Sequence, residues 1–458
     1  MKFINLTRRT EIGANSYYLG ANGQGMVLDS GMHPKEMGEA ALPNLAALGG
    51  RPVDAILISH AHLDHLGSLP VLMRQQPQAN VFMTSATAQI GDALLHNSVN
   101  VMTRQREEIG AAVYPLYTHR EAERATGRWR AAPLHQPINL AGERSRVSPN
   151  EEIDFEFWNA GHVLGAAGIR LRLEGRTVFY TGDVNFDDQT LLKGASFPEG
   201  DVDVLIIETT HGTTPVPEGF TREGELERFA AALNTVFARG GCVLIPVFAL
   251  GRTQEILTLL YNLKRAQTIA DVPIYIGGLS AKMTEIYDRR AHDTARVLPR
   301  FQLFPEVQPF VLNSKSIDDA AARPGRVYAL SSGMMTPKTL SNRFARRLLE
   351  RPEHAIFFVG YADPESPAGV LRAAPPGSLV SLDEDEPAQE LRCGVEQFRF
   401  SAHASRASLV DYIRKVAPRK VVLVHGDPPA VEWMRAAAVA ALPEAEVIVP
   451  PPGVEIEL

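Results

Sequence analysis

The feature that most constrains this chain is a dense cluster of histidines, which reads His60-Ala61-His62-Leu63-Asp64-His65. It directly follows Val53-Asp54-Ala55-Ile56-Leu57-Ile58, an apolar run that is typical of a strand buried on both faces. His60 and His62 are two residues apart, so on extended backbone both rings point to the same side and can reach one metal ion. Asp64 and His65 lie where the chain turns and can serve a second metal ion nearby. Because imidazole and carboxylate are donors that zinc prefers, the stretch predicts a zinc site at the end of a buried strand.

The composition is that of a globular enzyme. The 458 residues suffice for two domains with buried cores, and 45% of them are hydrophobic and 22% charged. The first nine residues contain no apolar core of signal-peptide length, and no apolar run approaches the length that spans a membrane. Cys242 and Cys393 are too few for a disulfide framework or a cysteine zinc cluster. We therefore expect a cytoplasmic protein with no membrane partner.

The charge of the chain is unevenly distributed. The formal net charge of −7 is not typical of a nucleic-acid-binding protein, but binding depends more on the distribution of charge than on its sum. Lys338 to Arg351, which includes Arg346, contains one acid, and Arg399 to Lys420, which includes Arg406, also contains one acid. Each basic stretch is equally compatible with a solvated helix face and with a surface that binds nucleic acid.

The pattern of strands and helices divides the chain into three parts. In the first, short apolar strands alternate with turns and helices, which favours an α/β sandwich; residues 86–126 are mostly helical, with a break at Pro115. From about residue 209, strand-then-helix units repeat, including a helix at 338–349, and predict a parallel-sheet insert. The chain then returns to a strand at 397–400, a helix at 409–416 and a buried strand at 420–424.

Three more possible metal ligands follow predicted strands. His162 follows a strand that ends at Trp158, Asp183 follows one that ends at Tyr180, and His425 follows the strand at 420–424. A single histidine after a strand is usually structural, but four strand-end motifs with the right donors in one chain favour a metal centre. A centre with two metal ions needs six or seven nitrogen and oxygen donors, and the Asp183 carboxylate can bridge both ions.

These motifs, in this order, resemble a known family. Asp29, the His60–His65 cluster, His162 and Asp183 resemble motifs one to four of the metallo-β-lactamase superfamily. Ile207-Glu208-Thr209-Thr210-His211-Gly212, Ser401-Ala402-His403 and His425-Gly426 resemble motifs A, B and C of the β-CASP nucleases, and Pro246 to Arg252 resembles the start of the β-CASP insert. The resemblance extends from about Thr10 to Pro428. It implies an αββα metallo-β-lactamase domain made of residues 1–208 and 396–458, with a parallel-sheet β-CASP domain, residues 209–395, inserted into it.

The resemblance also implies a role for each motif residue. His60, His62 and His162 would hold one zinc ion, and Asp64, His65 and His425 a second, with Asp183 bridging the two and Asp29 orienting ligands by hydrogen bonds. A hydroxide between the metal ions would attack phosphorus, and His403, oriented by Glu208, would protonate the leaving 3′-oxygen. The implied catalytic set is Asp64, Asp183, Glu208 and His403, and the products would carry a 5′-phosphate and a 3′-hydroxyl.

The substrate depends on motif C, because family members that act on RNA carry histidine there and the DNA-repair branch typically carries valine. His425 therefore favours single-stranded RNA. His211 replaces a common tyrosine, and the loops at Met335–Lys338 and Glu365–Gly369 depart from the family pattern, which puts the substrate preference in doubt. We expect substrate contacts at five residues near these motifs or in the basic stretches: Ser332, Gly333, Arg346, Ser401 and Arg406.

Three other functions compete with a ribonuclease. A DNA nuclease of the same fold is disfavoured by His425, and a hydrolase of small esters or thioesters is disfavoured by the insert, which would cover the site. An inactive RNA-binding subunit of a processing complex would be expected to lack ligands, whereas every ligand is present here. The sequence does not separate endonuclease from 5′-exonuclease activity, or a monomer from a homodimer.

Overall fold

The chain forms two compact units in the computed structural model, which describes residues 1–110, 113–145, 153–313, 315–319 and 322–458. The first unit consists of Met1–Asp187, Gly194–Pro215 and His403–Leu458, and the second consists of Asp188–Lys193 and Val216–Ala402. Helices and strands are mixed in both units, so the predicted α/β class is confirmed.

The first unit contains two seven-stranded sheets. In order across the sheet, the strands of one are β22 (Glu455–Glu457), β1 (Lys2–Asn5), β2 (Tyr17–Ala21), β3 (Gln24–Leu28), β4 (Ala55–Leu57), β5 (Asn80–Met83) and β6 (Trp129–Ala131). Those of the other are β21 (Glu446–Ile448), β20 (Lys420–Val424), β11 (Val204–Glu208), β10 (Arg176–Tyr180), β9 (Ala167–Leu173), β8 (Asp154–Asn159) and β7 (Ile138–Asn139).

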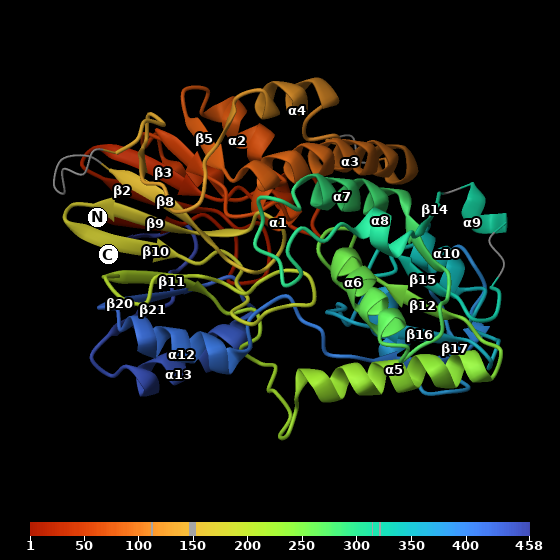
Figure 1. The fold of residues 1–458 in the computed structure, drawn as a ribbon. Helices are drawn as coiled ribbons and strands as arrows, with labels where there is room; N and C mark the ends of the chain where they lie inside the picture. Colours follow the sequence, from red (N-terminus) through yellow and green to blue (C-terminus); the bar gives the residue numbers. More distant parts are fainter. Residues whose placement is uncertain (111–112, 146–152, 314, 320–321) are drawn as a thin grey trace. The chain divides into compact units, whose positions relative to one another are not determined.

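Apolar side chains hold the two sheets of the first unit together. One core cluster takes side chains from both sheets, for example Phe3 and Leu57 from one and Phe155 and Ile206 from the other, so it lies between them. A second cluster joins the opposite face of the first sheet to helices, through residues such as Ile56, and the result is a layered sandwich (Figure 1). The helices of this unit are η1 (Gly38–Ala41), η2 (Leu45–Leu48), α1 (Leu63–Leu66), α2 (Leu69–Gln75), α3 (Ser85–Ile109), α4 (His119–Thr126), α12 (Arg406–Val416) and α13 (Pro428–Ala441).

The second unit is built on a six-stranded sheet in which every neighbouring pair is parallel. Side chains alternate across this sheet: Ile356 and Phe358 join a core cluster with α10 and α11, whereas Phe357 packs against Phe229 of α5, 5.9 Å between ring centroids. The sheet order is β14 (Phe310–Leu312), β13 (Ile274–Gly277), β15 (Val327–Leu330), β12 (Val243–Pro246), β16 (Ala355–Phe358) and β19 (Gly394–Gln397), with a separate pair, β17 (Leu379–Val380) and β18 (Gln389–Glu390). The helices are α5 (Arg222–Ala238), α6 (Arg252–Arg265), α7 (Gly278–Arg289), α8 (Leu303–Val307), α9 (Ser316–Asp319), α10 (Leu340–Ala345) and α11 (Pro367–Ala373).

A buried carboxylate attaches the short segment Asp188–Lys193 to the rest of the second unit. Glu255 of α6 accepts hydrogen bonds from the backbone N–H groups of Thr190 (2.7 Å), Leu191 (2.8 Å) and Leu192 (3.1 Å). Arg252, one turn earlier on α6, donates to the side-chain oxygen of Gln189 at 3.3 Å. These bonds compensate the loss of water around two buried charged groups.

Three predicted elements differ from the observed ones. The helix expected at 338–349 is only Leu340–Ala345, because Lys338 has a left-handed backbone (φ 65°) and most of the bonds that close the turns after Ala345 join residues three apart. The strand expected at 397–400 ends at Gln397, because the N–H of Arg399 donates to the Glu225 carboxylate instead of a neighbouring strand. The helix expected at 409–416 begins earlier, at Arg406, where the Ser405 side chain accepts from the N–H of Ser408.

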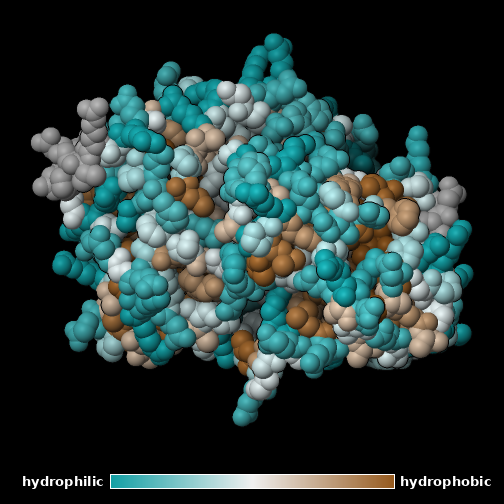
Figure 2. All heavy atoms as spheres, in the orientation of Figure 1, coloured by the Kyte–Doolittle hydropathy of each residue, from teal (hydrophilic) through white to brown (hydrophobic). Residues whose placement is uncertain are grey.

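The helical stretch expected at 86–126 is observed as α3 and α4, on the two sides of Pro115, and residues 111–112 of this stretch lie outside the described residues. In the part of the chain that the structure describes, no helix is both long and apolar enough to cross a membrane. The face drawn in Figure 2 is covered mostly by hydrophilic side chains, with apolar residues in small separate areas.

Candidate metal centre

The candidate metal ligands lie in the first unit, in loops that follow strands of both sheets and, for Asp64 and His65, in the short helix α1. Such loops can turn sharply: Asp29 and His425 have left-handed backbone (φ 60° and 50°), and so does Gly182 (φ 53°). A Cβ at position 182 would lie 2.7 Å from the Cβ of Ser59, so a side chain there would push Asp183 away from the histidine cluster. The donors follow β3 (Asp29), β4 (His60, His62, Asp64 and His65), β8 (His162), β10 (Asp183) and β20 (His425).

Three histidines and one carboxylate form the first group of donors. His62 Nδ1 lies 3.2 Å from His60 Nε2 and 3.1 Å from His162 Nε2. Asp183 Oδ2 lies 3.5 Å from the His60 nitrogen and 3.6 Å from the His162 nitrogen. Ligand bonds of 2.0–2.2 Å in a tetrahedron require donor atoms about 3.3–3.6 Å apart, so this group can hold one divalent metal ion with little rearrangement.

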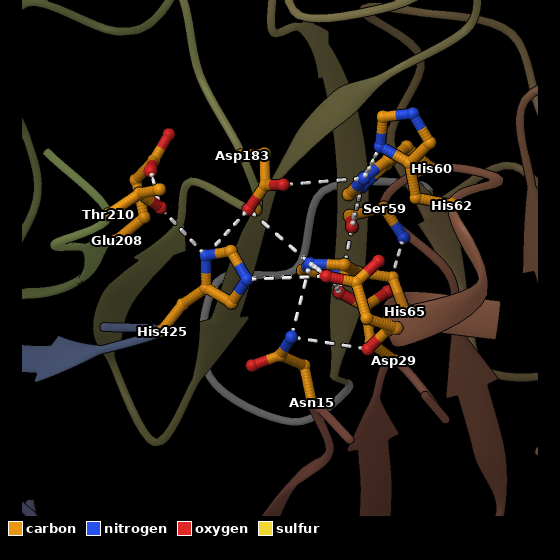
Figure 3. A network of polar contacts seen from close by, with 12 residues as sticks. Asn15, Asp29, Ser59, His60, His62, His65, Asp183, Glu208, Thr210 and His425 are labelled. Carbon is orange, nitrogen blue, oxygen red and sulfur yellow. Dashed lines mark hydrogen bonds and ion pairs between the residues drawn. The ribbon is translucent and has the colours of Figure 1, made fainter. Parts of the chain in front are cut away.

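Asp64, His65 and His425 form the second group, and Asp183 faces it with its other oxygen (Figure 3). Asp64 Oδ2 lies 3.8 Å from His65 Nε2 and 3.5 Å from His425 Nε2, and Asp183 Oδ1 lies 3.4 Å from His65 Nε2. Asp183 Oδ1 and His425 Nε2 are buried, and neither has a hydrogen-bond partner among the described residues. Buried polar atoms are rarely left unpaired, so these two atoms fit the requirement for a bound cation.

Asp29 controls which nitrogen of two histidines faces the other candidate ligands. Its carboxylate accepts from the Ser59 N–H (2.7 Å), the Ser59 hydroxyl (2.7 Å), the Tyr180 hydroxyl (2.6 Å) and His65 Nδ1 (2.8 Å). Because the Ser59 hydrogen points to Asp29, the Ser59 oxygen can only accept from His60 Nδ1, 3.0 Å away. Both histidines thus carry hydrogen on Nδ1 and present the Nε2 lone pair to the donor groups.

Burial and neighbouring charges set the protonation of the donors. Burial lowers the pKa of His60 and of His62, which keeps both rings neutral and able to bind metal. Burial alone would lower the pKa of His65, but Asp183 and Asp64 raise it well above its usual value. Burial raises the pKa of Asp64, but His65 and His425 outweigh it and bring that pKa down to about 2. A metal ion at the second group therefore competes with a proton on His65.

Glu208 and His403 form a pair beside the two donor groups. His403 Nδ1 lies 3.3 Å and 3.2 Å from the two Glu208 oxygens, and the backbone N–H of Val184 donates to the same carboxylate at 2.7 Å. Burial alone would lower the pKa of His403, but the Glu208 charge raises it to about 9. His403 is therefore protonated at neutral pH. The ring of His211 lies next to it, 5.6 Å between centroids.

The five residues expected to contact substrate are divided between the two units. Ser332, Gly333, Arg346 and Ser401 belong to the second unit, and only Arg406 shares a unit with the donor groups. Arg346 forms an ion pair with Glu386 (2.7 Å). The Arg406 guanidinium lies over the Trp433 ring, 4.2 Å from its centroid, and takes part in no ion pair among the described residues.

The second basic stretch is largely neutralised by ion pairs, with its own Asp411 and with acids from elsewhere in the chain. Arg414 pairs with Asp411 at 2.9 Å, and Lys415 pairs with Glu199 at 2.7 Å. Lys420 pairs with Glu446 at 3.0 Å. Most of this stretch is therefore an ion-paired helix surface and not a free basic face.

Sequence reasoning missed three residues that hold the donors in place, namely Ser59, Tyr180 and Thr210. Ser59 directly precedes the histidine cluster and Thr210 lies inside motif A, so their positions in the sequence were a signal. Tyr180 has no such signal, because only the packing of the two sheets brings its hydroxyl to Asp29, a residue 151 positions earlier.

The fold and the site together define a class of protein: a two-sheet sandwich whose strand ends gather histidines and aspartates able to bind divalent metal ions. The metallo-beta-lactamase superfamily model matches residues 9–206, and the Beta-Casp domain model matches residues 253–371. A third model, the Zn-dependent metallo-hydrolase RNA specificity domain, matches residues 389–450. The chain belongs to the metallo-β-lactamase superfamily and to its β-CASP family, which confirms the resemblance seen in the sequence motifs.

Named relatives agree with this family. The chain is 30% identical over 441 residues to endoribonuclease YSH1 of Eremothecium gossypii, and 30% identical over 442 residues to endoribonuclease YSH1 of Saccharomyces cerevisiae. It is 29% identical over 440 residues to cleavage and polyadenylation specificity factor subunit 3-I of Arabidopsis thaliana. Each alignment covers 93% of this chain but only 55%, 54% and 59% of the respective relative, so the chain spans a little over half of their length.

A solved structure shares the fold. The crystal structure of a protein of unknown function from Enterococcus faecalis V583 superposes with a TM-score of 0.56 at 13% sequence identity, over 100% of this chain and 99% of the other.

Proposed function

We propose that this chain is a zinc-dependent ribonuclease that cuts single-stranded RNA by hydrolysis and leaves a 5′-phosphate and a 3′-hydroxyl. Its cofactors are two Zn²⁺ ions, one at His60, His62 and His162 and one at Asp64, His65 and His425, with Asp183 shared between them. The main mode is endonucleolytic, and 5′-exonuclease activity is a second mode to be tested. The domain limits (1–208 with 396–458, and 209–395) and the cytoplasmic location stay predictions from the sequence.

The observation that carries this proposal is the Asp183 carboxylate, which faces one donor group with each oxygen while the Glu208–His403 pair lies alongside. Two metal ions and one proton donor can together catalyse the hydrolysis of a phosphodiester. The match to an RNA specificity domain includes both His403 and His425, and two of the relatives are named endoribonucleases. These findings support RNA as the substrate over DNA or a small ester.

Different residues of the chain have different roles in such a reaction. When bound, the metal ions supply positive charge for the phosphate oxygens and lower the pKa of a water molecule. Asp29 keeps His60 and His65 in the tautomer that leaves Nε2 free. Glu208 accepts from His403 Nδ1, so the proton on His403 Nε2 is the one available to the leaving 3′-oxygen, and the raised pKa keeps that proton in place at neutral pH.

The proposal is tested with purified protein, supplied with zinc, on 5′-labelled single-stranded RNA and DNA of identical sequence. We expect RNA to be cut and DNA to be cut far more slowly, with loss of activity on addition of a chelator and recovery on return of zinc. A ladder of labelled fragments would indicate endonuclease activity, and a labelled mononucleotide 5′-exonuclease activity. Intact RNA in the presence of zinc, or faster cleavage of DNA, would refute the proposal.

A further inference from the structure

Thr210 lies between the two parts of the candidate site. Its hydroxyl contacts the Glu208 carboxylate on one side and His425 Nδ1, at 3.0 Å, on the other (Figure 3). Glu208 also forms a hydrogen bond with His403, and His425 belongs to the second donor group. A single hydroxyl thus connects the proton donor with the metal-binding histidine.

The direction of the two hydrogen bonds follows from the chemistry of the groups. An ionised carboxylate only accepts, so the Thr210 hydroxyl hydrogen points to Glu208. The Thr210 oxygen can then only accept from His425, which places a hydrogen on Nδ1 of that ring. The Nε2 lone pair of His425 is left to face Asp64, whose Oδ2 lies 3.5 Å away. Among the described residues, this Nε2 is one of the buried atoms without a hydrogen-bond partner.

The same arrangement occurs a second time in the site. Ser59 donates to the Asp29 carboxylate and accepts from His60 Nδ1, 3.0 Å away, which fixes the tautomer of a ligand in the first donor group. Each donor group therefore contains one histidine that is oriented by a carboxylate through an intervening hydroxyl. The repetition in two unrelated loops argues that the Thr210 contact is part of how the ligands are positioned.

The neighbouring residue, Thr209, has a purely structural role and serves as a comparison. The Thr209 hydroxyl donates to the backbone carbonyl of Val424, at 3.1 Å, and so ties the loop after β11 to β20. The Thr210 hydroxyl, in contrast, contacts two side chains of the candidate site, Glu208 and His425. Its role is therefore directed at Glu208 and His425.

We propose that Thr210 is a positioning residue that fixes the metal-binding tautomer of His425 and joins it to the carboxylate that holds His403. Two consequences follow. Loss of the hydroxyl should weaken metal binding at the second donor group, and it should also loosen Glu208 and slow the reaction when metal is saturating. The second consequence rests on the proposed ribonuclease function, whereas the first depends only on metal binding.

The test compares Thr210→Val, which removes the hydroxyl and keeps the shape, with Thr210→Ser, which keeps the hydroxyl. Thr103→Val is the matched control, because Thr103 is exposed on α3 and bonds only to the carbonyl of Val99. Metal-free full-length protein is titrated with zinc against a chelating indicator, and circular dichroism monitors folding. RNA cleavage is measured separately with zinc in excess. Thr210→Ala removes the hydroxyl without a branched side chain and replaces the valine variant if that protein does not fold.

We expect Thr210→Val to weaken one of two zinc-binding events by about 10–100-fold, the usual effect of removing a partner of a metal ligand, and to leave the other unchanged. Thr210→Ser should restore both zinc affinity and cleavage rate to near wild type, and Thr103→Val should change neither. Normal zinc binding by a folded Thr210→Val protein would overturn the inference, and so would a serine variant as defective as valine. If zinc binding responds as expected but wild-type protein cuts no RNA, the proposed function fails and the positioning role stands.

Discussion

Replacing Asp29 by asparagine should weaken metal binding more than it disturbs the fold. The exchange preserves the size of the side chain, and asparagine tolerates the left-handed backbone at this position (φ 60°). However, the carboxylate accepts four hydrogen bonds, one on Oδ1 from the Ser59 N–H and three on Oδ2 from Ser59, His65 and Tyr180. An amide has one oxygen, so its NH₂ group must face at least one of these donors.

The size of the loss in stability depends on which hydrogen-bond donor around residue 29 loses its acceptor. The amide oxygen should take the Oδ2 side, where three donors converge, and leave the buried Ser59 N–H unpaired at a cost of about 1–3 kcal/mol in the free energy of unfolding. Loss of the negative charge also weakens the hydrogen bond from His65 Nδ1 to residue 29. Removing such a partner typically reduces metal affinity about 10–100-fold, which corresponds to about 1.4–2.7 kcal/mol of binding free energy.

Two measurements on the same protein check this prediction. Zinc titration of metal-free protein against a chelating indicator gives the affinity, and urea denaturation of the metal-free protein gives the stability. Asp54→Asn is the control, because Asp54 accepts from the backbone N–H of Gly25 (2.8 Å) and contacts none of the donors. The reasoning is refuted if Asp29→Asn binds zinc as tightly as wild type.

Four further predictions concern catalysis and substrate binding. His403→Ala should retain zinc and reduce RNA cleavage about a hundred- to ten-thousandfold, and a phosphodiester with a nitrophenyl leaving group, which needs no proton, should lose much less; an equal loss on both substrates would exclude proton donation. The cleavage rate of wild type should fall as the pH rises towards about 9, because His403 then loses its proton, and bound cations can only lower that pKa. Glu208→Gln removes the charge that raises this pKa, so the alkaline decline should move to lower pH, and an unchanged pH profile would contradict the pairing. For RNA binding, Arg406→Ala should reduce the slope of the logarithm of the binding constant against the logarithm of the salt concentration by about 0.7. Arg346→Ala should change this slope less, because Glu386 already neutralises the Arg346 side chain. Equal slopes in wild type and both variants would show that neither arginine contacts phosphate.

The sequence predicted the ligand set because strand ends are easy to recognise. A buried apolar run followed by His60, or by His425, identifies both a strand and the side chain at its end, and the family motifs supply the remaining donors. The α/β class followed from the same alternation of strands and helices. These features depend on residues that are close in the sequence, so local patterns are sufficient to find them.

Features that depend on tertiary contacts were not predictable in this way. Ser59 and Thr210 are small hydroxyl residues of a kind found in many loops, and only the folded chain shows which carboxylate and which imidazole each one joins. The ion pairs of the basic stretches were not predictable for the same reason, since Lys415 meets Glu199 from a distant part of the chain. The shortened helix α10 depends on the left-handed backbone of Lys338, which its residue type does not favour.

The hydrogen bonds of Glu255 have a practical consequence for protein engineering. A fragment of residues 216–402 contains the whole six-stranded sheet, but it lacks the segment Asp188–Lys193, which supplies three N–H groups to this carboxylate. In such a fragment the buried Glu255 would lose these partners, and Arg252 would lose Gln189. The second unit should therefore not be produced as residues 216–402 alone, because the six-residue segment Asp188–Lys193 belongs to it.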